Sequence, residues 1–368
     1  MGRDPGNRNG PAARPPRLTH AWSSSSLIQG LDMLHGALVT FRRPSDLASF
    51  LDSIGRQTRR LDHLVVVDCD PEGSGWPPLK AHLAATSGTP KAAADVIDYL
   101  PQDANLGAAG GWSVGQTFLA QGADDDDWIM MLDDDDPPRR ETVLEEREEF
   151  AEAMLSRDPM TAAVGGVGAM FDRRRGRLRR LGDAELDGPV RVDYVGSGHF
   201  PLYRVGVMRE LGPFLPELFL GYTELEYALR VHEAALPMYV DGDAILAKRS
   251  GAGTLGRPGR SRSRMVTSMP PWRVYYTTRN MVWMLRVTGH RTGALRVSVR
   301  RGLGRGLSQL LVSPRQAPRY LRAGWRGIRH GWSDVLGRVI DPDDPTLTVH
   351  ADRIVRRDRL MREPIEAS

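Results

Sequence analysis

The chain has 368 residues, of which 40% are hydrophobic, enough to build one large or two modest folded domains. Its single cysteine, Cys69, excludes a disulfide framework and a cysteine-based zinc site and is typical of a reducing compartment. The formal net charge of +4 conceals an asymmetry, because acidic residues crowd positions 124–149 whereas arginine dominates from Arg249 onward. The basic half favours an anionic membrane, a phosphate-bearing substrate or a nucleic acid as partner, unless it is a solvated face of helices.

The first residues, 1–30, are rich in Gly, Pro, Arg and Ser, and we predict that they form a disordered tail. They lack the apolar core of a signal peptide. No later stretch offers the roughly 20 apolar residues of a membrane-spanning helix, since arginines interrupt even positions 272–287. The sequence therefore predicts a cytoplasmic protein that does not cross a membrane.

Strands and helices alternate over the first half of the chain. Apolar runs predict strands at 36–41, 63–67, 94–100 and 128–132, and helical spacing predicts helices at 45–56 and 110–121. This alternation predicts a parallel, doubly wound α/β sheet. The later predictions, in chain order, are a charged exposed helix at 141–156, a central strand at 162–171, a basic hairpin or loop at 172–180, short strands at 190–195 and 199–203, helices at 224–235 and 272–287, and an Arg-rich amphipathic segment at 293–338.

Two acidic clusters, 124–127 and 133–136, bracket the fourth predicted strand. Five residues of extended chain, at ~3.3 Å each, separate them by roughly 17 Å, so they cannot share one site. Ligands of open α/β sheets bind beyond the carboxyl ends of the strands. This favours 133–136 as the functional cluster and predicts a solvated turn at 124–127.

Side chains alternate along extended chain, so Asp133 and Asp135 can point the same way and hold one divalent cation. Carboxylates and substrate phosphates are the usual ligands of Mg²⁺ and Mn²⁺. The alternative is a solvated acidic loop. We favour the cation because the cluster closes a buried strand on the ligand-binding edge.

Two further features fall on the same predicted edge. Asp68 follows the second strand, where a carboxylate can accept hydrogen bonds from a ribose or a base. The small residues of Asn105–Gly111 let the backbone approach a ligand closely, although a tight turn into the next helix explains them nearly as well. The G-x-G-x-x-G pattern is absent after the first strand, which argues against an NAD enzyme.

The helix predicted at 224–235 begins with Thr223-Glu224-Leu225-Glu226, which fits a capping box in which Thr223 caps the helix and Glu226 reaches back. Glu226 also pairs with Arg230 at helical spacing. Glu224 has no such structural duty. A carboxylate at a helix start beside a cleft can take a proton from a hydroxyl, but from these residues alone stabilisation of the helix dipole is the better explanation.

The order of these segments resembles glycosyltransferase family 2, most closely its bacterial galactofuranosyltransferase and rhamnosyltransferase branch. The resemblance runs from about His35 to the end of the chain. It is carried by Leu38-Val39-Thr40-Phe41-Arg42-Arg43, Gln57-Thr58, Leu64-Val65-Val66-Val67-Asp68, Asn105-Leu106-Gly107, Asp133-Asp134-Asp135, positions 222–230 and Tyr275-Tyr276-Thr277-Thr278-Arg279-Asn280.

The resemblance implies a GT-A catalytic domain over 31–265, a C-terminal helical, Arg-rich region over 266–368, and a sugar transfer that inverts the anomeric centre. It implies a nucleotide-sugar donor, UDP-galactofuranose or dTDP-rhamnose, and a glycan, lipid-linked or small-molecule acceptor. Mn²⁺ or Mg²⁺ would lie at Asp133 and Asp135, with Glu224 as base. The implied donor contacts are Thr40, Arg42, Asp68, Asn105, Gly110, Gly111 and Asp134, and the acceptor or phosphate contacts are Ser197, Gly198, Lys248 and Arg279.

Two positions depart from the family pattern. Thr223 and Glu224 replace two aspartates, and Lys248 falls where the family often has a metal-binding histidine. A binding or scaffold protein without activity is therefore an alternative, and a nucleic-acid-binding protein is a weaker one, because aromatic residues are not interleaved in the basic end. Trp325 and Trp332 in that end favour peripheral contact with the inner face of the plasma membrane. Helix packing explains them equally well, and a homo-oligomer stays open.

Overall fold

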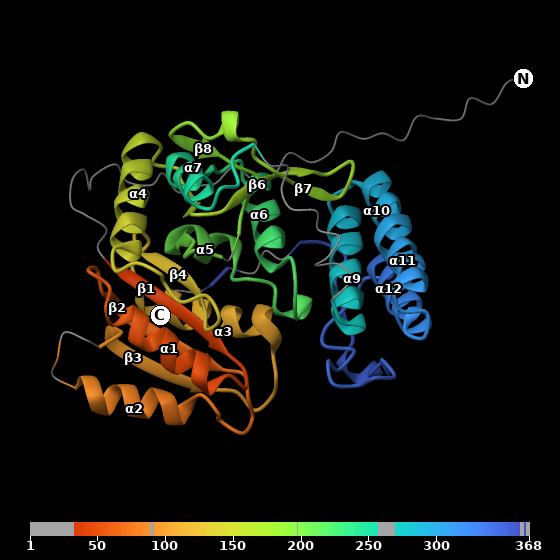
Figure 1. Cartoon of the computed structure of the whole chain (residues 1–368), viewed down its shortest axis with the longest axis horizontal. Helices are drawn as coiled ribbons and strands as arrows, with labels where there is room; N and C mark the ends of the chain where they lie inside the picture. Colours follow the sequence, from red (N-terminus) through yellow and green to blue (C-terminus); the bar gives the residue numbers. More distant parts are fainter. Residues whose placement is uncertain are drawn as a thin grey trace, which may run out of the picture.

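A computed structural model describes residues 33–87, 89, 92–196, 198–256, 269–360 and 364–365. The predicted tail, the predicted domain boundary between 265 and 266, and Ser197 lie outside these residues. The described chain is built on an eight-stranded sheet of order β3-β2-β1-β4-β10-β5-β11-β8. Figure 1 shows this sheet beside a group of C-terminal helices.

The large sheet is mostly parallel, as predicted. Its first four strands run parallel in the order β3-β2-β1-β4, whereas β10 and β8 run antiparallel to their neighbours. The strands are β1 (Leu34–Thr40), β2 (Leu61–Asp68), β3 (Ala94–Pro101), β4 (Trp128–Asp133), β5 (Ala163–Gly165), β8 (Pro189–Arg191), β10 (Leu202–Arg204) and β11 (Met238–Asp241). A second, antiparallel sheet contains β6 (Gly168–Asp172), β7 (Arg177–Arg180) and β9 (Tyr194–Val195).

Helices cover both faces of the large sheet, because strands β1, β2 and β4 are apolar on both faces. One face packs against α1 (Pro44–Ile54), α2 (Trp76–Thr86) and α4 (Val143–Arg157). The other packs against α3 (Gly107–Gly122), α5 (Val205–Leu211) and α6 (Thr223–Glu233). Helix α7 (Gly242–Gly251) follows β11. This is the doubly wound architecture expected from the strand and helix pattern, and it agrees with the GT-A fold that the family resemblance implies.

Two local predictions were wrong, and a third was wrong in part. The strand predicted at 162–171 divides into β5 and β6 of different sheets, and the one at 190–195 divides into β8 and β9. The acidic cluster 124–127 is not a solvated turn throughout. Asp127 is buried against His35. Asp126 forms an ion pair with Arg204 at the end of β10, and Asp125 forms one with Arg209 in α5. This cluster therefore ties the amino end of β4 to the rest of the sheet.

The C-terminal region is helical, with α9 (Pro271–Val287), α10 (Arg291–Val297), the π-helical turn η3 (Ser298–Leu303), α11 (Gly304–Val312) and α12 (Ala317–Trp332), followed by the short β12 (Val335–Leu336) and β13 (Val355–Arg356). Glycines let α12 pack closely. A Cβ at Gly324 would lie 2.1 Å from the Gly302 carbonyl oxygen of η3, and one at Gly331 would lie 2.7 Å from the Arg279 carbonyl oxygen of α9. Among the described residues, no helix has both the length and the apolar content needed to cross a membrane.

Candidate active site

The carboxyl end of β4 carries an acidic triplet. One carboxylate oxygen from each of Asp133, Asp134 and Asp135 lies within 4.8 Å of the others. Asp134 is buried, whereas the Asp135 side chain is 52% exposed. Among the described residues, this is a group of acids close enough to bind one metal ion, and it lies on the edge of the sheet where parallel α/β proteins bind their ligands.

Two residues that follow or end β1 hold this triplet in place. The Thr40 hydroxyl donates to Asp134 Oδ2 (2.7 Å). The Arg43 guanidinium donates to Asp134 Oδ1 (3.1 Å) and to Asp135 Oδ2 (2.6 Å). Thr40 is buried, so its side chain positions Asp134 instead of making the donor contact predicted for it. With both oxygens of Asp134 engaged, Asp133 and Asp135 are the better candidates to bind a cation.

Crowding of carboxylates disfavours full ionisation of the triplet. Burial, together with the charges of Asp135 and Asp134, raises the pKa of the Asp133 carboxyl to about 7. A carboxyl group must lose its proton to bind a metal ion, and a bound cation in turn favours the ionised form. A cluster of oxygen ligands with this excess of negative charge suits a hard divalent cation.

Asp68 ends β2, as predicted. It is fully buried, and its carboxylate accepts hydrogen bonds from the backbone N–H groups of Asp70 (3.0 Å) and Gly75 (2.7 Å) and from the Tyr99 hydroxyl (2.8 Å). These bonds fix the loop after β2. Contact of this carboxylate with the donor stays a prediction. Arg42, in contrast, follows β1 with a half-exposed side chain and an unusual positive φ of 55°.

The two glycines of α3 predicted to contact the donor, Gly110 and Gly111, have different surroundings. A Cβ at Gly111 would lie 2.7 Å from Val39 and 3.0 Å from Cys69, so Gly111 allows close packing of α3 on the sheet and does not contact a ligand. Gly110 faces the other way and lines a cavity of about 770 Å³. Asn105 lies two residues before α3, and its side-chain oxygen accepts from the N–H of Gly107, the first residue of the helix (2.8 Å).

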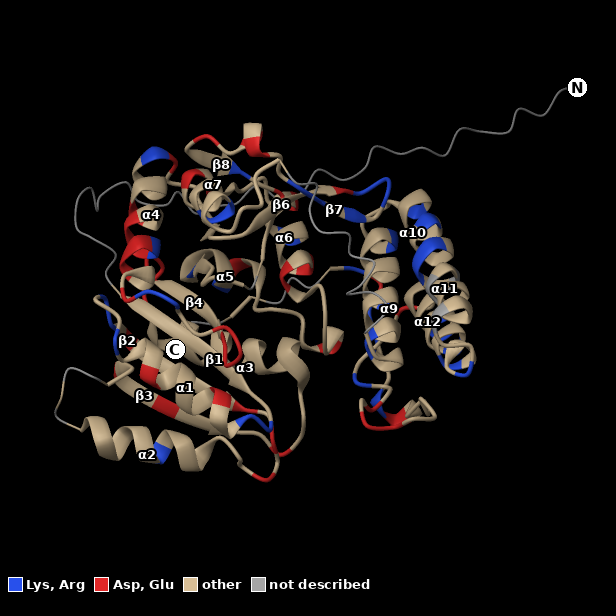
Figure 2. Cartoon of the chain, in the orientation of Figure 1, with Lys and Arg blue, Asp and Glu red and all other residues tan. Residues whose placement is uncertain are grey.

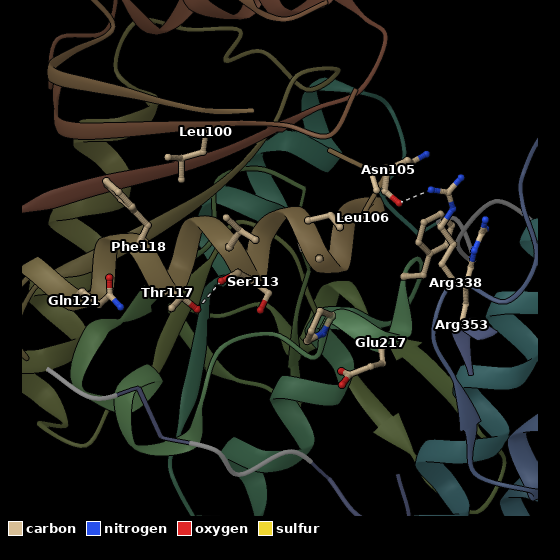
Figure 3. Close-up of a pocket in the computed structure, with 15 residues that line it drawn as sticks. Leu100, Asn105, Leu106, Ser113, Thr117, Phe118, Gln121, Glu217, Arg338 and Arg353 are labelled. Atoms are coloured by element: carbon tan, nitrogen blue, oxygen red, sulfur yellow. Dashed lines mark hydrogen bonds between the residues drawn. The ribbon is translucent and has the colours of Figure 1, made fainter. Parts of the chain in front are cut away.

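Figure 3 shows this cavity as a groove along α3. Side chains of Ser113, Thr117 and Gln121 line it along the helix, and Arg338 and Arg353 stand at the end where α3 begins. Arg338 donates to the Asn105 carbonyl oxygen (2.9 Å). The groove lining does not include the acidic triplet.

Glu224 lies in the first turn of α6 and is 7% exposed. The predicted capping box is wrong, because the residue before the helix is Tyr222, in the left-handed conformation (φ 66°), and no side chain caps the helix. The predicted pair of Glu226 and Arg230 is confirmed at 2.8 Å, and both side chains are fully buried. Glu226 is thus structural, which leaves Glu224 as the candidate acid of this turn.

The acidic triplet and the start of α6 are joined through the core. The Trp112 indole N–H of α3 donates to the carbonyl oxygen of Leu132, directly before the triplet (3.0 Å). The Trp112 ring packs edge-on against Phe214, which packs against Tyr227 of α6. Burial raises the pKa of the Tyr203 hydroxyl, and the nearby charge of Glu224 adds to the rise.

The loop that leads into α6 is held by α9. The Arg279 guanidinium is fully buried and donates to the carbonyl oxygens of Glu217 (3.1 Å), Leu218 (2.9 Å) and Gly337 (2.6 Å). The Asn280 amide donates to those of Leu218 (3.1 Å), Leu220 (3.1 Å) and Gly221 (2.9 Å). The predicted contact of Arg279 with acceptor or phosphate is therefore wrong, because its donors bind the protein's own backbone away from solvent.

The hydrogen bonds from Arg279 and Asn280 hold the loop before α6 in an unfavourable backbone conformation. Phe219, Gly221 and Tyr222 all have positive φ, at 61°, 84° and 66°, and non-glycine residues in this region cost about 1–3 kcal/mol each. The Phe219 carbonyl oxygen in turn accepts from the Ala109 N–H at the start of α3 (3.1 Å). Asn280 and Arg279 are thus positioning residues, since they set the place at which α6 and Glu224 begin.

Asn280→Ala is expected to lower kcat about tenfold or more while changing the KM for the donor less, because the loop before Glu224 loses three hydrogen bonds at roughly 1 kcal/mol each. Steady-state kinetics measure this split. The matched control is Thr278→Val on the same helix. Thr278 is buried, and its hydroxyl has no hydrogen-bond partner among the described residues. Equal losses in both variants would show a general packing defect.

Lys248 contacts His199, the residue that follows Gly198, beside Asp136. The Lys248 ammonium lies 2.6 Å from His199 Nε2, and the His199 backbone N–H donates to Asp136 (3.0 Å). Burial lowers the pKa of Lys248. These residues line or border a cavity of about 860 Å³ between α4 and α7, to which Arg139, Arg140 and Arg147 also contribute. Ser197, predicted alongside Gly198, is outside the described residues.

Comparison with known proteins decides the family. Galactofuranosyltransferase GlfT1 of Mycobacterium tuberculosis, in strains CDC 1551 and H37Rv, is 30% identical over 271 residues, which span 71% of this chain and 84% of the relative. The chain belongs to glycosyltransferase family 2. Family 2 membership makes it a glycosyltransferase with a GT-A fold and favours an enzyme over the binding-protein alternative. A scan against profiles of protein families found no match.

Solved structures of other glycosyltransferases also align with this family 2 enzyme. Staphylococcus aureus TarS residues 1–349 with UDP-GlcNAc aligns at a TM-score of 0.45 and 13% identity, covering 80% of this chain and 81% of TarS. The mannosyltransferase PcManGT of Pyrobaculum calidifontis, with GDP-Man and Mn²⁺, aligns at 0.41 and 15% identity over 81% and 86%. At these scores the overlaps add no argument, and the fold assignment rests on the chain's own topology and its mycobacterial relative.

The structure also adds residues that the sequence analysis did not single out. Arg43 binds two members of the triplet, and His199 contacts Lys248. The position of Arg43 directly after Arg42 in the first family segment was a usable signal. His199 had no such signal, because it and Lys248 are 49 positions apart in sequence and meet only in the folded protein.

Proposed function

We propose that this glycosyltransferase transfers galactofuranose from UDP-galactofuranose to a hydroxyl of a glycan, a lipid-linked glycan or a small molecule, with inversion of the anomeric centre. The observation that supports this sugar is the 30% identity over 271 residues to a protein named as a galactofuranosyltransferase. Rhamnose from dTDP-rhamnose is the second candidate, because the segment order resembles both parts of the branch. We also propose a cytoplasmic location.

The proposed cation, Mn²⁺ or Mg²⁺, lies at Asp133 and Asp135. The fit is supported by three carboxylates within 4.8 Å of one another and by Arg43, a positive side chain that already bonds to two of them. When bound, the cation would neutralise the charge of the diphosphate leaving group. Asp134, held by Thr40 and Arg43, would keep the three carboxylates in a fixed arrangement.

Glu224 is proposed as the general base. The oxygen of the acceptor hydroxyl attacks the anomeric carbon as the bond from that carbon to the diphosphate oxygen breaks. The hydroxyl proton passes to the Glu224 carboxylate, and the nucleoside diphosphate leaves. The place of Glu224 in the first turn of α6, directly after the loop that Asn280 holds, supports this role.

Arg42 is proposed to contact the donor phosphates, since it follows β1 beside the triplet with a half-exposed side chain. Lys248 and Gly198 are proposed to contact a phosphate or the acceptor from the cavity beside Asp136. Asn105 and Gly110, which line the groove along α3, would then contact the donor only if it extends into that groove.

A panel of nucleotide sugars tests this proposal. UDP-galactofuranose is expected to raise the melting temperature of the protein, and to raise it further with Mn²⁺, because a ligand stabilises the folded state that binds it. The donor that stabilises the protein is then tested for product formation. A rise with dTDP-rhamnose alone would change the proposed sugar, and no rise with any nucleotide sugar would contradict the proposal.

A further inference from the structure

The outer surface of the C-terminal helices is unusually apolar. Helix α10, the turn η3 and α11 follow one another without a break from Arg291 to Val312. Leu295, Val299, Leu307 and Leu311 recur at intervals of four or eight residues along them and are 60%, 57%, 56% and 90% exposed. Side chains at this spacing share one face of a helix. Leu310 beside them and Trp325 on α12 are also exposed.

The opposite side of this helix is packed against the protein. Ala294 and Val297 are fully buried, and Gly302 lies so close to α12 that an added Cβ would meet Ile328 at 2.2 Å. The exposed leucines therefore do not belong to an unfilled core. Trp332 is packed too, since its indole N–H donates to the Ser298 hydroxyl, so of the two predicted membrane tryptophans only Trp325 is on the surface.

The same helices carry an extreme charge. Residues 291–332 contain ten arginines and no Asp, Glu or Lys. Figure 2 shows this as blue along α10 and α11 without red. Arg291, Arg296, Arg315, Arg319 and Arg322 are exposed. An apolar stripe bordered by arginines is the pattern of helices that lie in the surface of anionic membranes.

We propose that this surface, defined by Leu295, Val299, Leu307, Leu310, Leu311 and Trp325 with the arginines around it, docks the protein on an anionic lipid membrane. The charge favours lipid over a second copy of the chain, because two such faces would bring their exposed arginines together without an acidic residue of the same helices between them. The leucines favour lipid over nucleic acid, which is bound through charge and does not need an exposed aliphatic stripe. The docking does not rest on the proposed function.

Docking would orient the active site. Arg301 of η3 donates to the Tyr222 hydroxyl in the loop before α6, and its guanidinium lies 5.2 Å from the centre of the Tyr222 ring. The helical segment that carries the docking surface thus contacts, through its buried side, the residue directly before α6. For a lipid-linked acceptor, a point that does rest on the proposed function, this contact would hold the base at a fixed place relative to the lipid surface.

Vesicle sedimentation of the full chain tests the docking. The protein is expected to pellet with phosphatidylcholine vesicles that contain about 30 mol% phosphatidylglycerol and not with phosphatidylcholine alone, and rising salt should weaken the binding. Leu307→Glu with Leu311→Glu is expected to lower the apparent affinity on the order of tenfold or more. The matched control is Val96→Glu with Leu255→Glu, which changes the charge equally at exposed apolar positions elsewhere, 52% and 45% exposed.

Equal loss in both double variants, or no binding of the wild type, would overturn the proposal. The proposal would also be overturned if the wild type formed an oligomer that bound no vesicles and the variant with Leu307→Glu and Leu311→Glu were a monomer. The surface would then join two copies of the chain. Retention of duplex DNA without vesicle binding would point to nucleic acid instead. Vesicle binding needs neither donor nor turnover, so a failed nucleotide-sugar panel leaves its outcome unaffected.

Discussion

Glu224→Gln is expected to lower kcat about 10²- to 10⁴-fold, the range that a general base contributes, while the Kd for the donor changes little. Glutamine keeps the size of the side chain and its place beside Tyr203 but cannot accept the hydroxyl proton at neutral pH. Because Glu224 is 7% exposed, the isosteric change also limits any packing defect. Single-turnover transfer assays with bound donor measure the effect on the chemical step.

Glu233→Gln is the matched control for this prediction, because Glu233 is exposed and ends the same helix. It should retain the kcat of the wild type. A kcat near that of the wild type in the Glu224 variant, with unchanged donor affinity, would remove Glu224 from the base role. A loss of donor affinity equal to the loss of kcat would make it a binding residue instead.

Removal of the metal is expected to lower the rate of sugar transfer about as strongly as the Glu224→Gln change does. Exhaustive chelation should abolish transfer, and added Mn²⁺ should restore it, because an unneutralised diphosphate is a poor leaving group. Asp135→Asn and Asp133→Asn should each require more Mn²⁺ for half-maximal activity and lower the maximum on the order of 10²-fold. Activity as a function of Mn²⁺ concentration measures both effects.

Asp136→Asn is the control for the metal site. Asp136 adjoins the triplet in sequence, but its carboxylate accepts from the His199 backbone N–H, so its Mn²⁺ response should match the wild type. Activity that survives chelation would reject a metal at Asp133 and Asp135. In that case Arg43, which already bonds to Asp134 and Asp135, and Lys248 would be the cations left to stabilise the leaving group.

Strand polarity explains why the sequence could locate the acidic triplet. The apolar runs of β1, β2 and β4 are long enough to identify, and their parallel order places every carboxyl end on one edge. Asp133 to Asp135 and Asp68 follow directly from that rule. What the rule does not give is the direction of a side chain. Asp68 turns into its own loop, and Thr40 turns to Asp134.

The failures come from contacts between distant segments. The capping box at Thr223 failed because Asn280, 57 positions away in sequence, holds the preceding loop so that Tyr222 takes a left-handed backbone. Arg279 looked like a phosphate ligand, since a motif shows residue types but not burial. Asp127 looked solvated until β1 placed His35 beside it. In each case tertiary packing overrode a local signal that was correctly read.

A crystal structure with UDP-galactofuranose and Mn²⁺ tests the central claim most directly, namely that the acidic triplet and Glu224 serve one cleft. We predict that Asp133 and Asp135 would hold Mn²⁺ beside the diphosphate, with the Glu224 carboxylate on the opposite face of the sugar. A donor lying wholly in the groove along α3, with Arg43 still bonded to Asp135 and no metal at the triplet, would contradict it.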